Sequence, residues 1–174
     1  MCHPELDSGS NLIIVQNTQL KLYYKEIMME CEFPSVNSNK KEIEEIFKEI
    51  KTIAVIGLSP DESKASHRVA AYLQKSGFKI VPVYPKEETI LGEKVYRSLK
   101  EIPFEVDMVD IFRKPKVLDD VADACIERGD IKVFWSQIGI VNNEAAQRAK
   151  DAGMRVVQNL CTMIEHSVEG LVSC

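Results

Sequence analysis

The sequence has no long hydrophobic run, no excess of positive charge and no paired-cysteine motif, and each absence excludes a class of protein. No stretch reaches the 18 or more uninterrupted apolar residues of a membrane span, and the start lacks the basic and apolar regions of a signal peptide. The formal net charge of −5 disfavours a general nucleic-acid binder, which carries an excess of lysine and arginine. Five cysteines, an odd number without a C-x-x-C pair, are typical of a reduced protein. We therefore expect a soluble, cytoplasmic protein.

Residues suited to catalysis or metal binding are also sparse. The three histidines are His3, His67 and His166, and the last of these does not form a recognised zinc spacing with Cys161 and Glu165. No nucleophile stands beside a recognisable base, and no pair of carboxylates accompanies a plausible reacting atom. The sequence therefore favours a binding protein without catalytic residues or a metal. An enzyme that uses Cys161 for acyl transfer is the alternative.

The chain divides near residue 38. Its 174 residues are enough for one ordinary domain that buries about 70% of the surface of the unfolded chain. Residues 1–38 do not share the pattern that follows, and we assign them to an N-terminal appendage. Two interpretations of residues 1–28 stay open: an additional strand, or translation begun upstream of a natural start at Met28 or Met29. Residues 39–174 are assigned to a single domain.

From Asn39 onwards, short apolar runs alternate with amphipathic helix patterns. Asn39 and Glu42 resemble a capping box at the start of the first helix. Three later helix patterns end in a glycine that leads directly into the next apolar run, as a left-handed helix cap requires; these are Gly77, Gly129 and Gly153. The apolar runs cover residues 52–56, 78–83, 106–112, 131–135 and 154–157. This alternation predicts an α/β, Rossmann-like, doubly wound parallel sheet of five strands in the order 3-2-1-4-5, with helices on both faces.

Each predicted strand ends in a loop of glycine, proline, serine or cationic residues. Because the carboxyl ends of parallel strands meet at one edge, all five loops are expected there, where open α/β sheets bind their ligands. The loops are Gly57-Leu58-Ser59-Pro60, Val83-Tyr84-Pro85-Lys86, Phe112-Arg113-Lys114-Pro115, Gln137-Ile138-Gly139 and Asn159-Leu160-Cys161.

The first loop lacks the second and third glycines of the dinucleotide fingerprint G-x-G-x-x-G, so it does not cradle a pyrophosphate in the usual way. Ser59, Lys64 and Ser66 instead offer hydroxyls and a cation near a helix N-terminus, whose free N–H groups attract anions. The alternatives are a turn role for Ser59, a solvated Lys64 and an N-cap role for Ser66. His67 either donates to the same anion or lies at the surface.

The second loop has Tyr84-Pro85-Lys86 where NAD-binding folds have an acidic residue for the ribose hydroxyls. Lys86 favours a ligand with an additional ribose phosphate, and Tyr84 and Pro85 offer flat apolar surface to a purine. Glu87 and Glu88 follow closely, however, so Lys86 alternatively belongs to an exposed charged turn. An NAD(P)-binding redox regulator is disfavoured on these grounds and is kept as a third possibility.

The third loop carries Arg113 and Lys114. Arg113 is suited to bidentate phosphate binding, unless Asp107 or Asp110 holds it in a scaffold salt bridge. With Lys64, Arg68 and Lys86, these two residues would form a local basic rim on an acidic protein.

The last two loops offer weaker signals. Gln137 presents an amide to a pantetheine-like chain, and Gly139 permits close approach of a ligand. Trp135 is expected in the core and Asn142 at a helix N-cap. Cys161 is either a small buried hydrophobe, a thiol that faces the ligand's own thiol, or a redox-responsive position.

Taken in order over about residues 30–166, a series of segments resembles the stand-alone bacterial CoA-binding domain proteins. That family is Rossmann-like and similar to the CoA-binding domain of the succinyl-CoA synthetase α subunit. The segments are Gly57-Leu58-Ser59, Lys64 to Ala70, Gly77-Phe78, Val81 to Pro85, Leu91-Gly92, Val109 to Arg113, Trp135 to Gly139, Asn142 to Ala145, Ala152-Gly153 and Cys161.

The resemblance implies coenzyme A or an acyl-CoA as the ligand. It places Gly57, Leu58, Ser59, Lys64 and Ser66 at the phosphates, Val83, Tyr84, Pro85 and Lys86 at the adenine and 3′-phosphate, and Phe112, Arg113, Ile138 and Gly139 along the rest of the cofactor. Tyr84 departs from the asparagine that the family commonly has in its Pro-Val-Asn-Pro segment. The expected function is non-catalytic binding by a sensor, carrier or partner subunit, with a partner protein or homodimer as possible assemblies. A subunit of an acyl-CoA ligase is the alternative.

Overall fold

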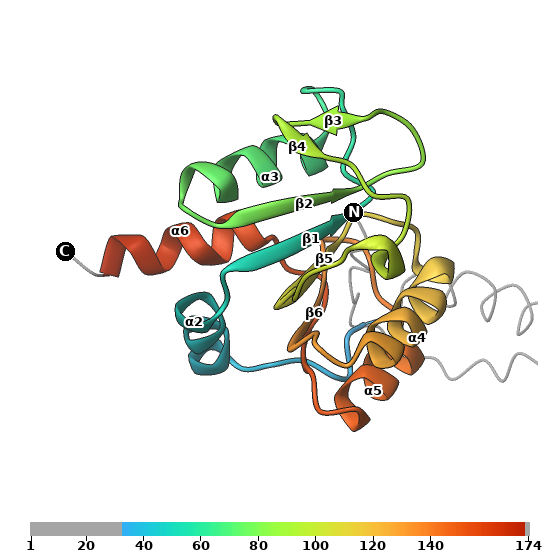
Figure 1. Ribbon diagram of the computed structural model, residues 1–174. Coiled ribbons are helices and arrows are strands. Elements are labelled where there is room, and N and C mark those ends of the chain that lie inside the picture. Colours follow the sequence, from blue (N-terminus) through green and yellow to red (C-terminus); the bar gives the residue numbers. More distant parts are fainter. Residues whose placement is uncertain (1–32, 173–174) are drawn as a thin grey trace, which may run out of the picture. The chain divides into compact units, whose positions relative to one another are not determined.

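The computed structural model describes residues 33–172 (Figure 1). The fold belongs to the unit Pro34–Cys174. The expectations for residues 1–28 lie outside the described residues. Among the described helices, none combines the length and apolar character that a membrane crossing needs.

Five parallel strands form the central sheet, in the order β2-β1-β5-β6-β7. They are β1 (Thr52–Ile56), β2 (Lys79–Val83), β5 (Met108–Ile111), β6 (Val133–Ser136) and β7 (Arg155–Val157). Nearly all of their residues are buried. Strands covered on both faces need apolar side chains on both sides, which explains the continuous apolar runs in the sequence.

Helices cover the two faces of the sheet (Figure 1). Helices α4 (Leu118–Arg128) and α5 (Asn143–Asp151) pack with one set of strand residues, including Ala54 and Ile56. Helices α2 (Lys40–Glu49) and α3 (Ala65–Lys75) pack with the alternate set, including Ile53 and Val55. Helix α6 (Thr162–Val172) contacts both α2 and α3. Asn39 and Glu42 form the predicted capping box of α2.

The predicted Rossmann-like fold is confirmed, but the strand position beyond β2 is not occupied by the segment that was expected there. The position beyond β2, expected for residues 106–112, is taken by Tyr96, which forms a parallel bridge to Val83. Residues 106–112 contain β5, which lies on the other side of β1. The direction of winding therefore reverses between β1 and β5, and such a reversal opens the crevice in which α/β sheets bind ligands.

A short hairpin and two turns of 3₁₀ helix complete the domain. Strands β3 (Thr89–Ile90) and β4 (Glu93–Lys94) pair in antiparallel fashion before Tyr96. The 3₁₀ turn η1 (Leu99–Glu101) follows Tyr96, and η2 (Pro115–Val117) precedes α4.

The residues just before α2 run beside β7. The backbone N–H of Ser38 donates to the Val156 carbonyl at 2.7 Å. Asn37 exchanges two hydrogen bonds with the backbone of Gln158, at 2.8 and 3.2 Å. These contacts satisfy backbone groups along the outer edge of β7, which would otherwise be open for pairing.

The three predicted glycine caps are confirmed, since Gly77, Gly129 and Gly153 all have positive φ. Gly129 closes α4 at φ 74°, and its backbone N–H donates to the Cys125 carbonyl. A Cβ added at Gly129 would meet no heavy atom within 4 Å. Glycine is therefore favoured here by the positive φ and not by a lack of space.

We expect Gly129→Ala to lower the free energy of unfolding by about 1 kcal/mol, because an L-residue is strained in the left-handed region. Urea denaturation followed by circular dichroism measures the change. An unchanged midpoint would contradict a left-handed cap at this position.

Candidate functional site

The loops after β1 and β5 meet where the winding reverses. The backbone N–H of Phe112 donates to the Ile56 carbonyl, and that of Gly57 donates to the Val83 carbonyl, both at 2.9 Å. Gly57 has φ 87°, and a Cβ on it would lie 2.8 Å from Cδ of Arg113 and 2.9 Å from the Phe112 carbonyl oxygen. The Arg113 side chain therefore lies directly against the backbone of the first loop.

The first loop is held in shape by its own serine hydroxyls. The Oγ of Ser66 accepts from the backbone N–H of Ser59 at 3.1 Å, and Nδ1 of His67 lies 3.0 Å from the Ser59 carbonyl oxygen. Because a carbonyl oxygen only accepts, Nδ1 of His67 carries the proton. Leu58 is fully buried and anchors the loop in the core.

Helix α3 begins at this loop without a side-chain cap. Its N-cap is Lys64, whose side chain makes no capping hydrogen bond, and its first turn contains no acidic residue. The expected alternative for Ser66 is therefore wrong: Ser66 is a buried first-turn residue and not the N-cap. An uncapped N-terminus leaves N–H groups and the positive end of the helix dipole available to an anion.

The arginines divide into two groups by their partners. Four of the six, namely Arg97, Arg128, Arg148 and Arg155, form salt bridges with carboxylates. Within residues 33–172, neither Arg68 nor Arg113 has a carboxylate partner, although Arg68 donates to the Ser63 carbonyl. Arg113 lies at the edge of the sheet where the predicted loops converge, whereas Arg68 lines the outer side of α3. The lysines of the expected basic rim, Lys64, Lys86 and Lys114, are exposed and form no salt bridge within the same residues.

The expected scaffold alternative for Arg113 is wrong. Asp107 pairs with Lys132 at 2.7 Å and accepts from two backbone N–H groups. Asp110 is fully buried and lies in a different hydrogen-bond network. Arg113 is consequently left for another anion.

Asp110 lies at the end of β5, in a buried network with Gln137 and Thr162. Nε2 of Gln137 donates to Oδ1 of Asp110 and to Oγ1 of Thr162, both at 2.8 Å, and the Thr162 hydroxyl donates to Oδ2 of Asp110 at 3.0 Å. Burial raises the pKa of Asp110 to about 7, although hydrogen bonds from Gln137 and Thr162 lower it. The expectation that Gln137 offers its amide to a pantetheine chain is therefore wrong for its N–H₂ group, which is already engaged. Gln137 instead ties the β6 loop to the ends of β5 and β7.

The outer part of the β6 loop remains at the surface. Ile138 is 62% exposed, and the backbone N–H of Gly139 donates to Oδ1 of Asn159 at 2.7 Å. Asn159 has φ 60°, which is rare for a residue other than glycine. The loops after β6 and β7 are thereby linked beside the crevice.

The remaining residues singled out from the sequence have structural partners. Trp135 is fully buried, as expected, and its Nε1 donates to the Leu160 carbonyl at 2.8 Å. Asn142 is the expected N-cap of α5 and accepts from Ala145 N at 3.0 Å. Cys161 is buried within the apolar cluster that contains Trp135. This position favours the interpretation of Cys161 as a small hydrophobe.

His166 belongs to an aromatic cluster and not to a metal site. Its Nδ1 lies 3.0 Å from the Tyr72 hydroxyl, and its ring packs edge-on against Phe47 and Phe78. Burial lowers the pKa of His166. These contacts fix α6 against α2 and α3.

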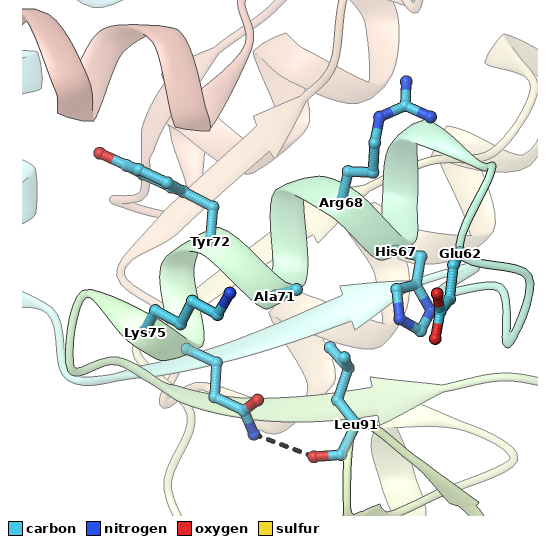
Figure 2. A pocket seen from close by; sticks show the side chains of 8 residues that line it. Glu62, His67, Arg68, Ala71, Tyr72, Lys75 and Leu91 are labelled. Carbon is cyan, nitrogen blue, oxygen red and sulfur yellow. Dashed lines mark hydrogen bonds between the residues drawn. The ribbon is translucent and has the colours of Figure 1, made fainter.

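A separate groove of about 540 Å³ runs along the outer side of α3 (Figure 2). Its wall opposite the helix includes Leu91, whose carbonyl oxygen accepts from Nε2 of Gln74 at 3.1 Å. It contains neither Gly57 nor Arg113, and it is thus distinct from the crevice between β1 and β5. The lining residues are Glu62, His67, Arg68, Ala71, Tyr72, Gln74, Lys75 and Leu91.

Comparison with known proteins assigns the domain. The profile of the family described as the CoA binding domain matches residues 51–167. The chain belongs to the CoA-binding domain family. An uncharacterized protein, YneT from Bacillus subtilis, is 42% identical over 132 residues, which are 76% of this chain and 97% of YneT. A hypothetical protein of known structure from Pyrococcus horikoshii is 37% identical, with a TM-score of 0.73 over 80% of this chain and 97% of that protein.

The same CoA-binding domain is part of larger enzymes. The α subunit of ADP-forming acetate–CoA ligase II from Pyrococcus furiosus is 33% identical over 122 residues, which are 64% of this chain. The match spans 27% of that subunit. The ligase subunit therefore has a large part with no counterpart in the matched region of this chain.

Arg97 is a residue that the sequence did not single out. It donates to carbonyl groups of the loop after β2, which carries the expected adenosine contacts. Its sequence neighbours offered no signal, because the contacts come from residues 10 to 13 positions away.

We expect Gly57→Ala to lower the free energy of unfolding by about 1–2 kcal/mol, because the left-handed backbone disfavours an L-residue and the new Cβ displaces Arg113. Urea denaturation gives the free energy. Gly92→Ala is the matched control: it also has positive φ, but a Cβ there meets no atom within 4 Å. Equal losses in the two variants would contradict the contact between Gly57 and Arg113.

We expect the stability of the wild type and of Asp110→Asn to respond differently to pH. Between the ordinary pKa of 3.8 and the folded pKa of about 7, the folded protein keeps the Asp110 proton and the unfolded chain releases it. The wild-type free energy of unfolding therefore falls as pH rises through this window, by up to about 1.4 kcal/mol per pH unit from this group. Asparagine does not titrate, so its variant lacks this component. Denaturation at pH 5, 6 and 7 measures the difference, and parallel pH profiles would refute a raised pKa.

Proposed function

We propose that this chain binds coenzyme A or an acyl-CoA, without catalysis, in the crevice between the loops after β1 and β5. The observation that carries the proposal is Arg113, which lacks a carboxylate partner within the described residues and lies against the first loop, just before α3 begins without a side-chain cap. Coenzyme A carries a phosphomonoester of about −1.5 to −2 charges and a pyrophosphate. Its charge therefore matches a cationic edge on an otherwise acidic protein.

Each loop contacts a different part of the ligand. The backbone of Gly57 and Ser59, the Lys64 ammonium group and the start of α3 contact the pyrophosphate. The buried Leu58 anchors that loop in the core, and Ser66 supports it through Ser59. The adenine and 3′-phosphate meet the loop after β2, from Val83 through Tyr84 and Pro85 to Lys86.

Arg113 reaches the phosphates from the opposite side of the crevice. Phe112 and the exposed Ile138 offer apolar contact to the pantetheine chain, and Gly139 permits its close approach. Gln137 acts as a positioning residue beneath this surface, because its amide is occupied by Asp110 and Thr162.

Two features favour coenzyme A over NAD(H). The loop after β2 has a lysine in place of the acidic residue that binds an unphosphorylated ribose. In the first loop, Ser59 occupies the position of the second glycine of the dinucleotide fingerprint, where the backbone would approach a pyrophosphate. Calorimetric titration with coenzyme A, acetyl-CoA, NADH and NADPH tests the choice. Tight binding of NADH without binding of coenzyme A would reverse it.

A role as a partner subunit in acyl-CoA synthesis is the second candidate. It is favoured by the similarity to acetate–CoA ligase α subunits, in which the matching region is about a quarter of the chain. Incubation of the purified protein with acetyl-CoA, followed by chromatographic measurement of free coenzyme A, tests whether this chain turns over alone. Release of more than one equivalent of coenzyme A per chain, with acetate as the second product and abolished by Cys161→Ser, would support acyl transfer through Cys161 to water and contradict non-catalytic binding.

We expect Arg113→Ala to weaken coenzyme A binding by about 1.5–3 kcal/mol, the range for hydrogen bonds to charged groups. Its stability should stay within about 0.5 kcal/mol of the wild type, because Arg113 has no carboxylate partner within the described residues. Calorimetry and urea denaturation measure the two quantities. Arg155→Ala is the control, since it removes an ion-paired arginine at the start of β7, away from the ligand edge. Unchanged affinity in Arg113→Ala would assign this arginine to the scaffold.

A further inference from the structure

The loop after β2 is held from one side by a single arginine. Arg97 follows Tyr96, whose bridge to β2 places it beside the end of that strand. Nη1 of Arg97 lies 3.1 Å from the carbonyl oxygen of Tyr84, and 2.7 Å from those of Lys86 and Glu87. A guanidinium group only donates hydrogen bonds. All three carbonyl oxygens are therefore fixed toward Arg97.

These contacts stabilise an unfavourable backbone. Glu87 has φ 62°, a left-handed conformation that is strained for a residue with a Cβ. Arg97 binds the carbonyl groups of Lys86 and Glu87, which lie on either side of the Glu87 Cα. Arg97 thus fixes the part of the loop from which the Lys86 side chain projects.

Arg97 also changes the charge of the loop. Its Nη2 lies 3.2 Å from Oε1 of Glu88, which is otherwise almost fully exposed. Without Arg97 the loop would have one lysine and two glutamates, and an approaching phosphate would be repelled. With Arg97 the four charges balance. Lys86 itself is exposed and forms no salt bridge within the part of the chain that the structure describes.

We propose that Arg97 is the positioning residue that gives this site its selectivity for a ribose 3′-phosphate, by fixing the loop from which Lys86 reaches that group. The inference rests on the proposed function, because it assumes that the adenosine end of the ligand lies at this loop. Arg97 does not contact the ligand. It acts through the carbonyl groups of Tyr84, Lys86 and Glu87.

The test compares coenzyme A with 3′-dephospho-CoA by calorimetry on the full chain. In the wild type, removal of the 3′-phosphate should weaken binding at least about tenfold, as expected for loss of a charge-assisted hydrogen bond. In Arg97→Ala, coenzyme A should lose more affinity than 3′-dephospho-CoA, so the ratio of the two dissociation constants falls to within about threefold of unity.

A second variant separates geometry from charge. Arg97→Lys keeps the positive charge, but its single nitrogen lies one bond nearer the backbone than Nη1 and would have to serve both the three carbonyls and Glu88. Its ratio should therefore fall as in Arg97→Ala. Arg155→Ala is the matched control, an ion-paired arginine at the start of β7 whose loss should leave the ratio unchanged. Circular dichroism and thermal unfolding establish that each variant is folded.

The outcomes separate this inference from the proposed function. If the wild type binds neither ligand, the proposed function fails. If the wild type binds both ligands equally, or if Arg97→Ala weakens both by the same factor, coenzyme A binding stands and the selectivity role of Arg97 is overturned. A wild-type ratio in Arg97→Lys would show that charge alone suffices, which also overturns the geometric role.

Discussion

The contact between Gly57 and Arg113 is possible because the chain reverses its winding direction between β1 and β5. In a sheet wound in one direction only, the loops after neighbouring strands leave over the same face, and no opening forms between them. Here the loop after β1 turns toward α3 and the loop after β5 turns toward α4, which lie on opposite faces. The Arg113 side chain can lie against the first loop because Gly57 has no Cβ. The cationic edge therefore depends on topology first and on side chains second.

Beneath that edge, a buried carboxylate links three strand ends. Asp110 is the last polar side chain before the end of β5, and it is paired in register with Trp135 on β6. Its two carboxyl oxygens accept hydrogen bonds from Gln137, after β6, and from Thr162, after β7. No cation contributes to the shift of its pKa. Burial without a cationic partner disfavours the charged form of this group, which is why the pKa of Asp110 is raised.

The sequence was sufficient for the features that depend on local chemistry. Helix caps at Asn39, Asn142 and Gly129 were predictable because each is specified by one or two residues. The strand order was only partly predictable, because Tyr96 follows a hairpin of two-residue strands whose apolar pattern is too short to identify. The surroundings of Arg113 and the hydrogen-bond partners of Gln137 and Arg97 were not predictable, since each depends on which loops meet in space. Asp110 and Arg113 are three residues apart in sequence, yet the Asp110 carboxyl group lies in the core and the Arg113 side chain is exposed.

Both outer strands of the sheet already have neighbours from this chain: Tyr96 beside β2, and Asn37 and Ser38 beside β7. A second molecule that added a strand at these positions would first have to displace those contacts, so edge-to-edge growth of the sheet is disfavoured beside Val83 and Val156.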